Sequence, residues 1–142
     1  VENMERLEKK FSLASEVLPK SIIQQGIKTA KVGLIFYGTT SHAIVEAQTR
    51  LKETGIVTDT LRIRAFPFDE SIDKFIAEHE SIFVIEQNRD GQMQSLLINE
   101  LAVDPLHLQE VLNFDGLPIT SSFITERVIE SLSKQQTSQQ VS

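Results

Sequence analysis

The chain has 142 residues, no cysteine and a formal net charge of -6 at pH 7. This length fits one domain that can bury a hydrophobic core without needing disulfide bonds or a structural metal. The missing cysteines exclude disulfide bonds, a cysteine nucleophile, thiolate zinc sites and cysteine-held iron–sulfur clusters within the chain. No basic run could neutralise several phosphates, so we expect no nucleic-acid partner. No stretch has the apolar length of a membrane span or signal peptide, so we expect a cytoplasmic protein without membrane contact.

The first 18 residues predict an amphipathic helix that ends before Pro19. Its apolar residues recur at spacings of three and four, while Glu, Lys and Arg occupy the other face. The apolar residues are Met4, Leu7, Phe11, Ala14 and Leu18. Two interpretations fit the pattern. The helix lies on its own domain, or it connects this chain to a domain upstream.

Strand patterns then alternate with helix patterns, which is typical of a layered α/β sheet with mostly parallel strands. The predicted strands are 21–25, 31–37, 57–64, 82–85 and 108–114. Helices are predicted after the second, third, fourth and fifth strands. The last residues, SKQQTSQQVS at 133–142, are polar and aperiodic, and we expect them to be disordered.

The strand at 57–64 differs from the others because polar residues alternate with apolar ones. Its polar face carries Thr58, Thr60, Arg62 and Arg64. We predict that no apolar helix covers this face in the usual way. The two arginines can hold a carboxylate or a phosphate, and they can equally pair with acidic neighbours such as Asp69.

The stretch 81–92, SIFVIEQNRDGQ, is the centre of the predicted fold. Its apolar run, IFVI, is typical of a strand that is buried on both faces. The polar residues after the run lie at the carboxyl end of the strand, where open α/β sheets bind ligands. Glu86 can act there as an acid or base, and Arg89 can hold an anion. A structural interpretation also fits, in which Asp90 caps the next helix while Arg89 pairs with Glu86.

Three further motifs favour structural roles. YGTT at 37–40 contains one glycine and matches neither the dinucleotide fingerprint nor the P-loop, so we interpret it as a turn with a helix cap. His42, His79 and His107 are widely separated, and we expect surface or capping roles for them instead of metal ligation. Ser41 and His42 are helix neighbours that do not face each other, which excludes a nucleophile and base pair.

Four segments carry a family resemblance: KVGLIFYGTT, TLRIRAFPF, IFVIEQNRDGQ and NFDGLPIT. Together they resemble the C-terminal domain of the alpha subunit of 2-oxoacid:ferredoxin oxidoreductases, particularly the 2-oxoglutarate type. The sequence is also similar, more distantly, to the C-terminal domains of transketolase and of 2-oxoacid dehydrogenase beta subunits. The resemblance covers about residues 18–132. It implies a three-layer α/β/α domain with a five-stranded mixed sheet of order 1-3-2-4-5, whose first strand is antiparallel.

The resemblance also implies an activity for the parent enzyme. Such enzymes use thiamine diphosphate and magnesium to decarboxylate a 2-oxoacid, pass electrons through iron–sulfur clusters to ferredoxin, and release an acyl-CoA. The family holds thiamine diphosphate in pyrimidine-binding and pyrophosphate-binding domains, and neither is recognisable here. No catalytic, cofactor-binding or metal-binding residue is therefore carried over to this chain. The implied division is a connector helix at 1–18, a transketolase C-terminal-like domain at 19–132 and a disordered tail at 133–142.

We therefore expect a non-catalytic assembly domain that contacts the beta subunit and the pyrimidine-binding domain of its own subunit, with ferredoxin as an indirect partner. The expected interface or ligand contacts are Glu86, Arg89, Asp90, Asp115, Arg62 and Arg64. Two alternatives stay open. One is a stand-alone module that binds an anion or small molecule with the Gly38 turn, Arg62 and Arg64. The other is an enzyme with its own acid–base site at Glu86.

Overall fold

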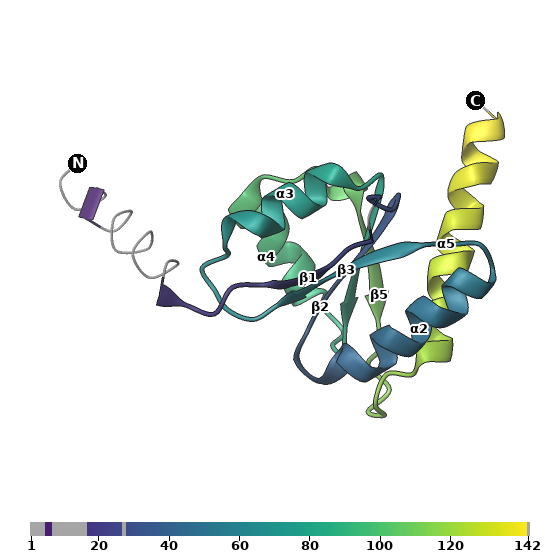
Figure 1. Cartoon of the computed structure of the whole chain (residues 1–142), viewed down its shortest axis with the longest axis horizontal. Coiled ribbons are helices and arrows are strands. Elements are labelled where there is room, and N and C mark those ends of the chain that lie inside the picture. The colour runs from purple at the N-terminus through teal and green to yellow at the C-terminus, as the bar shows by residue number, and fades with distance from the viewer. Residues whose placement is uncertain (1–4, 7–16, 27, 142) are drawn as a thin grey trace.

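Five strands form one sheet with helices on both faces (Figure 1). The computed structural model describes residues 5–6, 17–26 and 28–141. The elements are β1 Ile22–Gln24, β2 Val32–Tyr37, η1 Gly38–Thr40, α2 Ser41–Glu53, β3 Thr58–Ile63, α3 Glu70–Glu78, β4 Ser81–Glu86, α4 Gln92–Leu101, η2 Pro105–His107, β5 Leu108–Leu112 and α5 Ser121–Val141. The sheet order is β1-β3-β2-β4-β5, and of the described strands only β1 runs antiparallel to its neighbour. The predicted fold and strand order are confirmed.

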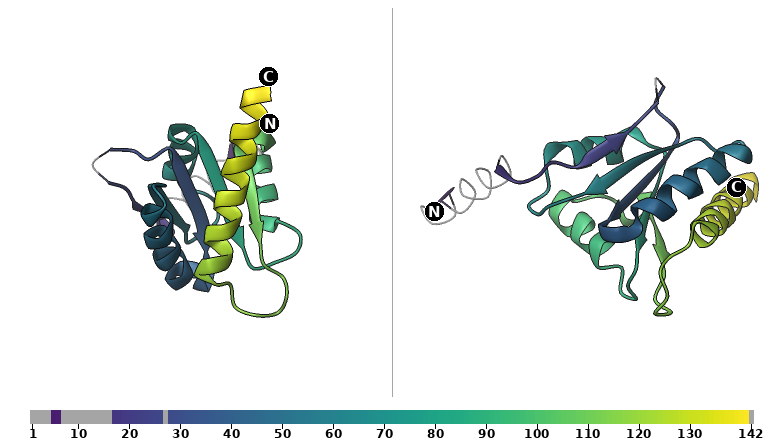
Figure 2. Two further views of the ribbon diagram at one scale, coloured as in Figure 1. Left: turned by 90° about the vertical axis from the view of Figure 1, so that its right-hand side faces the viewer. Right: turned by 60° about the horizontal axis from the view of Figure 1, so that its bottom comes forward.

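The two helical layers follow from the alternation of side chains along the buried strands. β2 sends Leu34 and Phe36 into one hydrophobic cluster, where they meet Ile44 of α2 and side chains of α5. The same strand sends Ile35 into a second cluster, where it meets Phe75 of α3 and side chains of α4. In the right-hand view of Figure 2 the strands lie between these two helical layers. The sheet is therefore covered on both faces, which explains its nearly continuous apolar central strands.

The polar face of β3 is covered over its first half. Gln48 of α2 donates a hydrogen bond from Nε2 to the carbonyl oxygen of Thr58 at 3.1 Å. Thr60 on the same face is 3% exposed. Only toward the end of the strand does the face reach solvent, because Arg62 is half-buried and Arg64 is exposed. The uncovered polar face that we predicted is therefore limited to the carboxyl end of β3.

His79 is buried, which corrects the predicted surface or capping role. Its Nδ1 lies 2.6 Å from the carbonyl oxygen of Phe75, and its Nε2 lies 2.8 Å from Oδ2 of Asp59. Asp59 also accepts a hydrogen bond from the backbone N–H of Ala30 at 2.9 Å. Both ring nitrogens of His79 thus lie within hydrogen-bonding distance of an oxygen atom. A buried pair of side chains, Asp59 and His79, therefore ties α3 to β3 and to the segment before β2.

Gly33 in β2 leaves the space that the buried His79 ring needs. A Cβ atom at Gly33 would lie 2.7 Å from Cε1 of Phe75 and 3.1 Å from Cγ of His79. The rings of Phe75 and His79 themselves pack in a tilted arrangement, with centroids 4.2 Å apart. Glycine in the middle of a strand is therefore explained by close packing of two rings.

The predicted disordered tail is wrong over the part that the structure describes, because residues 133–141 continue α5. Lys134 pairs with Glu130 one turn earlier at 3.3 Å, an arrangement that supports a helix. Ser81 at the start of β4 donates to Oε1 of Gln135 at 3.3 Å. An ion pair and one anchoring contact thus extend the helix without an apolar stripe, and α5 projects past the sheet (Figure 1).

The predicted helix at 1–18 lies mostly outside the described residues, so it stays a prediction. The described chain is anchored just after it, because the N–H of Ser21 donates to Oδ2 of Asp69 at 2.7 Å. Asp69 also caps α3 by accepting from the N–H of Ser71. Burial raises the pKa of the Asp69 carboxyl, but the hydrogen bonds from Ser71 and Ser21 outweigh burial and hold that pKa below its usual value.

Replacing either member of this buried pair should destabilise the fold, because the other polar side chain stays in the core without its partner. We expect Asp59→Asn or His79→Gln to lower the free energy of unfolding by about 1–3 kcal/mol. Urea denaturation followed by circular dichroism measures this change. A double-mutant cycle should show strong coupling between the two positions.

An exposed ion pair on α3 gives a matched control. Nζ of Lys74 lies 3.8 Å from Oε1 of Glu78 on the solvent side of the helix. Lys74→Gln should cost less than about 1 kcal/mol, because water screens this pair. Similar small losses for His79→Gln and Lys74→Gln would contradict a stabilising role of the buried pair.

Candidate functional site

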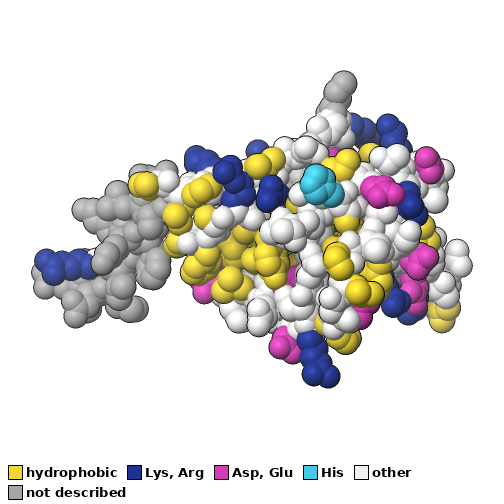
Figure 3. Space-filling view, turned by 90° about the horizontal axis from the view of Figure 1, so that it is seen from below, with side chains coloured by type: hydrophobic (Ala, Val, Ile, Leu, Met, Phe, Trp, Pro, Cys, Tyr) yellow, Lys and Arg dark blue, Asp and Glu magenta, His cyan; other side chains and the backbone are white. Residues whose placement is uncertain are grey.

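The loops that follow β2, β4 and β5 meet at the carboxyl edge of the sheet. β2 continues into α2 on one face and β4 continues into α4 on the other, so the connections diverge between these two neighbouring strands. Open α/β sheets bind ligands at such a point. Figure 3 views the molecule from this side and shows hydrophobic side chains exposed between charged ones. This edge is the candidate functional site.

Glu86, the last residue of β4, is at the centre of the edge and is 1% exposed. Its Oε1 accepts from the N–H of Met93 at 2.7 Å, and its Oε2 accepts from the N–H of Gln94 at 3.2 Å. These two amides belong to the first turn of α4, where the helix dipole favours a negative charge. Glu86 therefore caps α4 from inside the fold and presents no carboxylate to solvent.

A carboxylate does cap α4, as the structural interpretation predicted, but it belongs to Glu86 and not to Asp90. Asp90 does not cap α4, because the N-cap position is Gly91, which has no side chain to accept a hydrogen bond from the helix. Asp90 and Arg89 are both exposed, and Arg89 forms no ion pair or hydrogen bond within the described part of the chain. Arg89 is therefore not paired with Glu86. Both tip residues are available to a partner.

Asn88 holds the loop in shape. Its Oδ1 accepts from the N–H groups of Asp90 at 3.1 Å and of Gly91 at 2.9 Å. Gly91 adopts a positive φ of 59°, and a Cβ atom there would lie 2.8 Å from Oε1 of Glu110. The positive φ therefore favours glycine here, whereas the Glu110 carboxylate is the end of a flexible side chain that can move aside. The two hydrogen bonds to Asn88 brace the loop tip.

Tyr37 at the end of β2 completes the network. Its hydroxyl lies 3.2 Å from Oε1 of Glu86, and Nδ2 of Asn88 donates to the same hydroxyl at 3.0 Å. Burial raises the pKa of Tyr37, and the charge and hydrogen bond of Glu86 raise it further, while Asn88 lowers it. Tyr37 is thus a donor to the buried carboxylate and ties the loop after β4 to the end of β2.

A groove of about 450 Å³ lies beside this network. One wall belongs to the loops after β2 and β4, where Nε2 of Gln87 donates to Oγ1 of Thr40 at 3.2 Å. The other wall is the turn after β5. The lining residues are Thr39, Gln87, Asn113, Phe114, Gly116, Leu117 and Pro118. Phe114 and Leu117 were absent from the predicted contacts, although large apolar residues beside Asp-Gly in a turn are a signal that could have identified them.

The remaining predicted contacts do not form one cluster. Arg62 donates from Nη2 to the carbonyl oxygen of Gly38 at 3.2 Å, so the structure brings this arginine to the Gly38 turn. Arg64 instead reaches the carbonyl oxygen of Lys20 at 3.5 Å. The carboxylate of Asp115 accepts from the N–H of Leu117 at 2.9 Å and so serves its own turn. The predicted pairing of the arginines with Asp69 is absent from the described residues.

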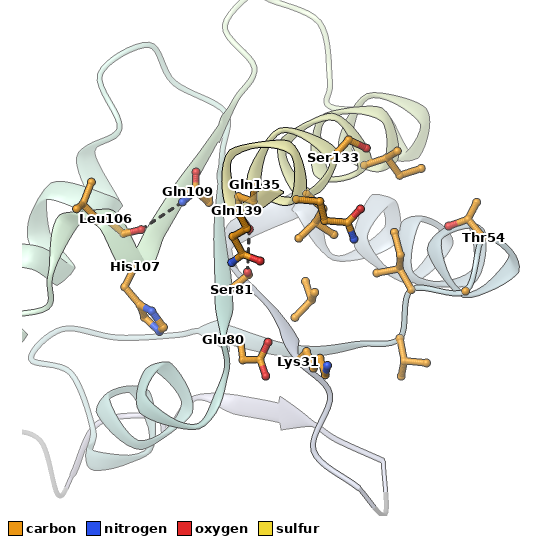
Figure 4. A pocket seen from close by; sticks show the side chains of 17 residues that line it. Lys31, Thr54, Glu80, Ser81, Leu106, His107, Gln109, Ser133, Gln135 and Gln139 are labelled. Atoms are coloured by element: carbon orange, nitrogen blue, oxygen red, sulfur yellow. Dashed lines mark hydrogen bonds between the residues drawn. The ribbon is translucent and has the colours of Figure 1, made fainter. Parts of the chain in front are cut away.

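A larger groove of about 1010 Å³ lies at the opposite edge, between α5 and the amino ends of the strands (Figure 4). Its walls are mixed, with Lys31, Glu80 and Gln135 beside apolar residues of α5. His107 is engaged at this groove, because its Nε2 lies 2.9 Å from the carbonyl oxygen of Ile76. The described residues contain no group of three or more His, Asp or Glu side chains placed to hold a metal ion. This groove therefore offers no recognisable catalytic cluster.

The contact between Tyr37 and Glu86 can be tested by titration, because the chain has one tyrosine and no tryptophan. We expect the absorbance of tyrosinate to appear with a midpoint above the ordinary value of about 10. Glu86→Gln should lower that midpoint, because the neighbouring negative charge is removed. Because folding raises the pKa of Tyr37, its protonated hydroxyl stabilises the folded state. This stabilisation is complete below the pKa of the unfolded chain, about 10, and is lost as the pH rises through the pKa of the folded chain. Circular dichroism at each pH checks that the fold persists, and an unchanged midpoint in the variant would refute the contact.

The identity of the α4 cap is tested by comparing two carboxylates in one loop. Glu86→Gln should lower the free energy of unfolding by about 1.5–3 kcal/mol, because charge-assisted hydrogen bonds to buried amides are weakened. Asp90→Asn is the matched control and should change it by less than about 0.5 kcal/mol. Chemical denaturation measures both. The reverse order of losses would assign the cap to Asp90.

Known proteins with related sequences and structures share this fold. No family model matches the sequence. Subunit alpha of 2-oxoacid:ferredoxin oxidoreductase 2 from Aeropyrum pernix is 25% identical over 135 residues, which cover 90% of this chain and 21% of that subunit. The chain thus spans about a fifth of the length of this curated relative.

Two solved structures agree with this relationship. A 2-oxoglutarate:ferredoxin oxidoreductase from Magnetococcus marinus, with 2-oxoglutarate, coenzyme A and succinyl-CoA bound, matches 91% of this chain and 23% of its own chain at 26% identity, with a TM-score of 0.76. A split-gene transketolase matches 80% of this chain and 42% of its own at 15% identity, with a TM-score of 0.65, which shows the fold alone. The resemblance seen in the sequence is confirmed: the chain is homologous to alpha subunits of 2-oxoacid:ferredoxin oxidoreductases and has the transketolase C-terminal-like fold.

Proposed function

We propose that this chain is the non-catalytic assembly domain of the alpha subunit of a cytoplasmic, thiamine-diphosphate-dependent 2-oxoacid:ferredoxin oxidoreductase that acts on 2-oxoglutarate. The enzyme converts 2-oxoglutarate, coenzyme A and oxidised ferredoxin into succinyl-CoA, carbon dioxide and reduced ferredoxin. The ligands bound to the Magnetococcus marinus enzyme support this choice of substrates. None of the helices in the described part of the chain is long and apolar enough to cross a lipid bilayer.

The observation that carries the proposal is that the carboxylate of Glu86 is buried and caps α4. A general acid or base must reach the substrate to move a proton. Both carboxylate oxygens of Glu86 already accept backbone N–H groups of α4, and the side chain is 1% exposed. The carboxylate at the ligand-binding edge thus supports a helix, which argues against an acid–base site at Glu86. The exposed side chains of the edge, among them Arg89 and Asp90, are suited to contact a partner.

The residues of this edge do not fit the thiamine diphosphate and magnesium that the family implies. Magnesium bound to a diphosphate needs free carboxylate or amide oxygens. The buried carboxylate of Glu86 is committed to α4, and the carboxylate of Asp115 accepts from the N–H of Leu117. Asp90 remains as an exposed carboxylate, and the described residues contain no group of three or more His, Asp or Glu side chains placed to hold a metal ion. We assign the cofactor, the metal and the iron–sulfur clusters to other domains or subunits of the enzyme.

The assembly role assigns a use to each part of the chain. Residues 19–132 are the docking domain, and residues 1–18 connect it to the pyrimidine-binding domain of the same subunit. The beta subunit is the second partner, and ferredoxin interacts only indirectly. Relatives that are four to five times longer support this division, because most of their length lies outside the part that this chain matches.

A stand-alone anion-binding module is the second candidate, because Arg62 reaches the Gly38 turn. A phosphate there would have to take Nη2 of Arg62 away from the carbonyl oxygen of Gly38. Titrating the full chain with inorganic phosphate and with coenzyme A tests this candidate. We expect no saturable binding by calorimetry, and binding that is lost in Arg62→Gln but kept in Arg127→Gln would favour the module.

The assembly role predicts how the complete enzyme responds to a change at the edge. In the complete complex, turnover should require 2-oxoglutarate and coenzyme A, and Glu86→Gln should keep turnover per assembled complex within about threefold. A lost general acid or base would instead cost about 10²–10⁴-fold. Ferredoxin reduction measures turnover, and gel filtration gives the amount of assembled complex. Stronger turnover with another 2-oxoacid would refute the substrate, and a hundredfold loss at constant assembly would make Glu86 catalytic.

A further inference from the structure

Two large apolar side chains stand exposed on the turn after β5. Phe114 is 63% exposed and Leu117 is 69% exposed. Their turn is braced from within, because Nδ2 of Asn113 donates to the carbonyl oxygen of Leu117 at 3.0 Å and the N–H of Leu117 donates to Oδ1 of Asp115 at 2.9 Å. The bracing holds both side chains in water at the edge that carries the Glu86 network. Clustered apolar side chains held in this way are typical of an interaction surface.

The wall opposite these side chains is also held by a hydrogen bond, and it is uncharged. Gln87 follows the buried Glu86 directly and is fixed by its hydrogen bond to Thr40. None of the residues that line the groove carries a charge. An ionised group buried there would lose its hydration without gaining a partner, whereas an apolar group would not. The groove therefore selects for an uncharged occupant.

The groove is open, which decides between a small molecule and a protein segment. Small-molecule pockets enclose most of the ligand surface. Of the residues that line this groove, only Asn113 is buried, and the others are exposed. A small ligand would stay largely in water, while a protein segment would cover the rim as well as the groove. The exposed Arg89 and Asp90, close in the chain to Gln87, supply the polar rim that protein interfaces have.

We propose that this groove receives an uncharged, apolar segment of a neighbouring subunit of the same oxidoreductase complex, with Phe114 and Leu117 as the anchoring side chains. The inference rests on the proposed function, because relatives that are alpha subunits imply neighbouring subunits. This chain spans 21% of the related alpha subunit, so the groove belongs to a small part of a much larger assembly. Two anchors on one braced turn lose little entropy on binding, which makes them suitable hot spots.

The absence of cysteine in the sequence allows a direct test with single thiols. Phe114→Cys places a thiol at the groove, and Val45→Cys is the matched control, because Val45 is 58% exposed on α2. The complete complex that carries either variant is treated with N-ethylmaleimide, and mass spectrometry measures labelling of the relevant peptide against the same complex unfolded in urea. We expect labelling at position 114 to be at least about tenfold slower than at position 45. Equal rates in the intact complex overturn the proposal.

A second variant tests the energetic role of the anchors. Leu117→Asp should weaken association of the subunits at least about tenfold, while Val45→Asp should not, and circular dichroism should show an unchanged fold in both. Unchanged association of Leu117→Asp overturns the anchoring role. Slow labelling in a dimer of the full chain alone would assign the groove to a second copy, and slow labelling that dialysis abolishes would assign it to a small molecule. Either result overturns the proposal.

Failure of this inference can be distinguished from failure of the proposed function. A complex that turns over 2-oxoglutarate while position 114 is labelled freely contradicts the docking groove and leaves the function standing. A complex that protects position 114 but does not turn over 2-oxoglutarate contradicts the function and leaves the docking groove standing.

Discussion

The loops at the carboxyl edge of the sheet are held together by one buried carboxylate, that of Glu86 at the end of β4. Glu86 satisfies two amides of the helix, and the same side chain accepts from the hydroxyl of Tyr37 and from Asn88. A carboxylate in such a place would be costly without these partners, because its hydration is lost on burial. The partners come from the end of β2, from the loop and from the helix, so this one charge fixes the relative positions of all three segments.

A second buried polar pair does the same near the other end of the strands. Asp59 near the start of β3 and His79 just before β4 hold the segment before β2 through Ala30. Because buried polar groups without partners are unfavourable, alternative packings of α3 or α4 that separate either set of partners are disfavoured. Loops that are braced in this way suit a surface that docks to a partner with little loss of conformational entropy, whereas many enzymes need mobile loops that close over their substrate.

Local sequence signals predict the strands and the helices that follow them, because each element depends on residues within a few positions of one another. Strand order follows from the family resemblance and not from periodicity. The features that local signals do not predict depend on longer separations. Glu86 caps amides seven and eight residues along the chain, and His79 meets Asp59 across 20 residues. Local signals predict disorder for the tail of α5, because its helix is supported by an ion pair and a contact with β4 and not by an apolar stripe.

The same reasoning explains why the exposed turn after β5 carries the docking argument better than the charged loop tip. Charges such as Arg89 and Asp90 are common at loop tips and, in water, contribute little to binding. Phe114 and Leu117 are different, because about two thirds of each side chain contacts water although a turn of their composition needs no large apolar residue. Their contact with water is unfavourable for the chain alone, and a partner that covers them removes this unfavourable contact. An edge whose buried carboxylate caps its own helix, and whose apolar side chains stay exposed, therefore supports the proposed role in association.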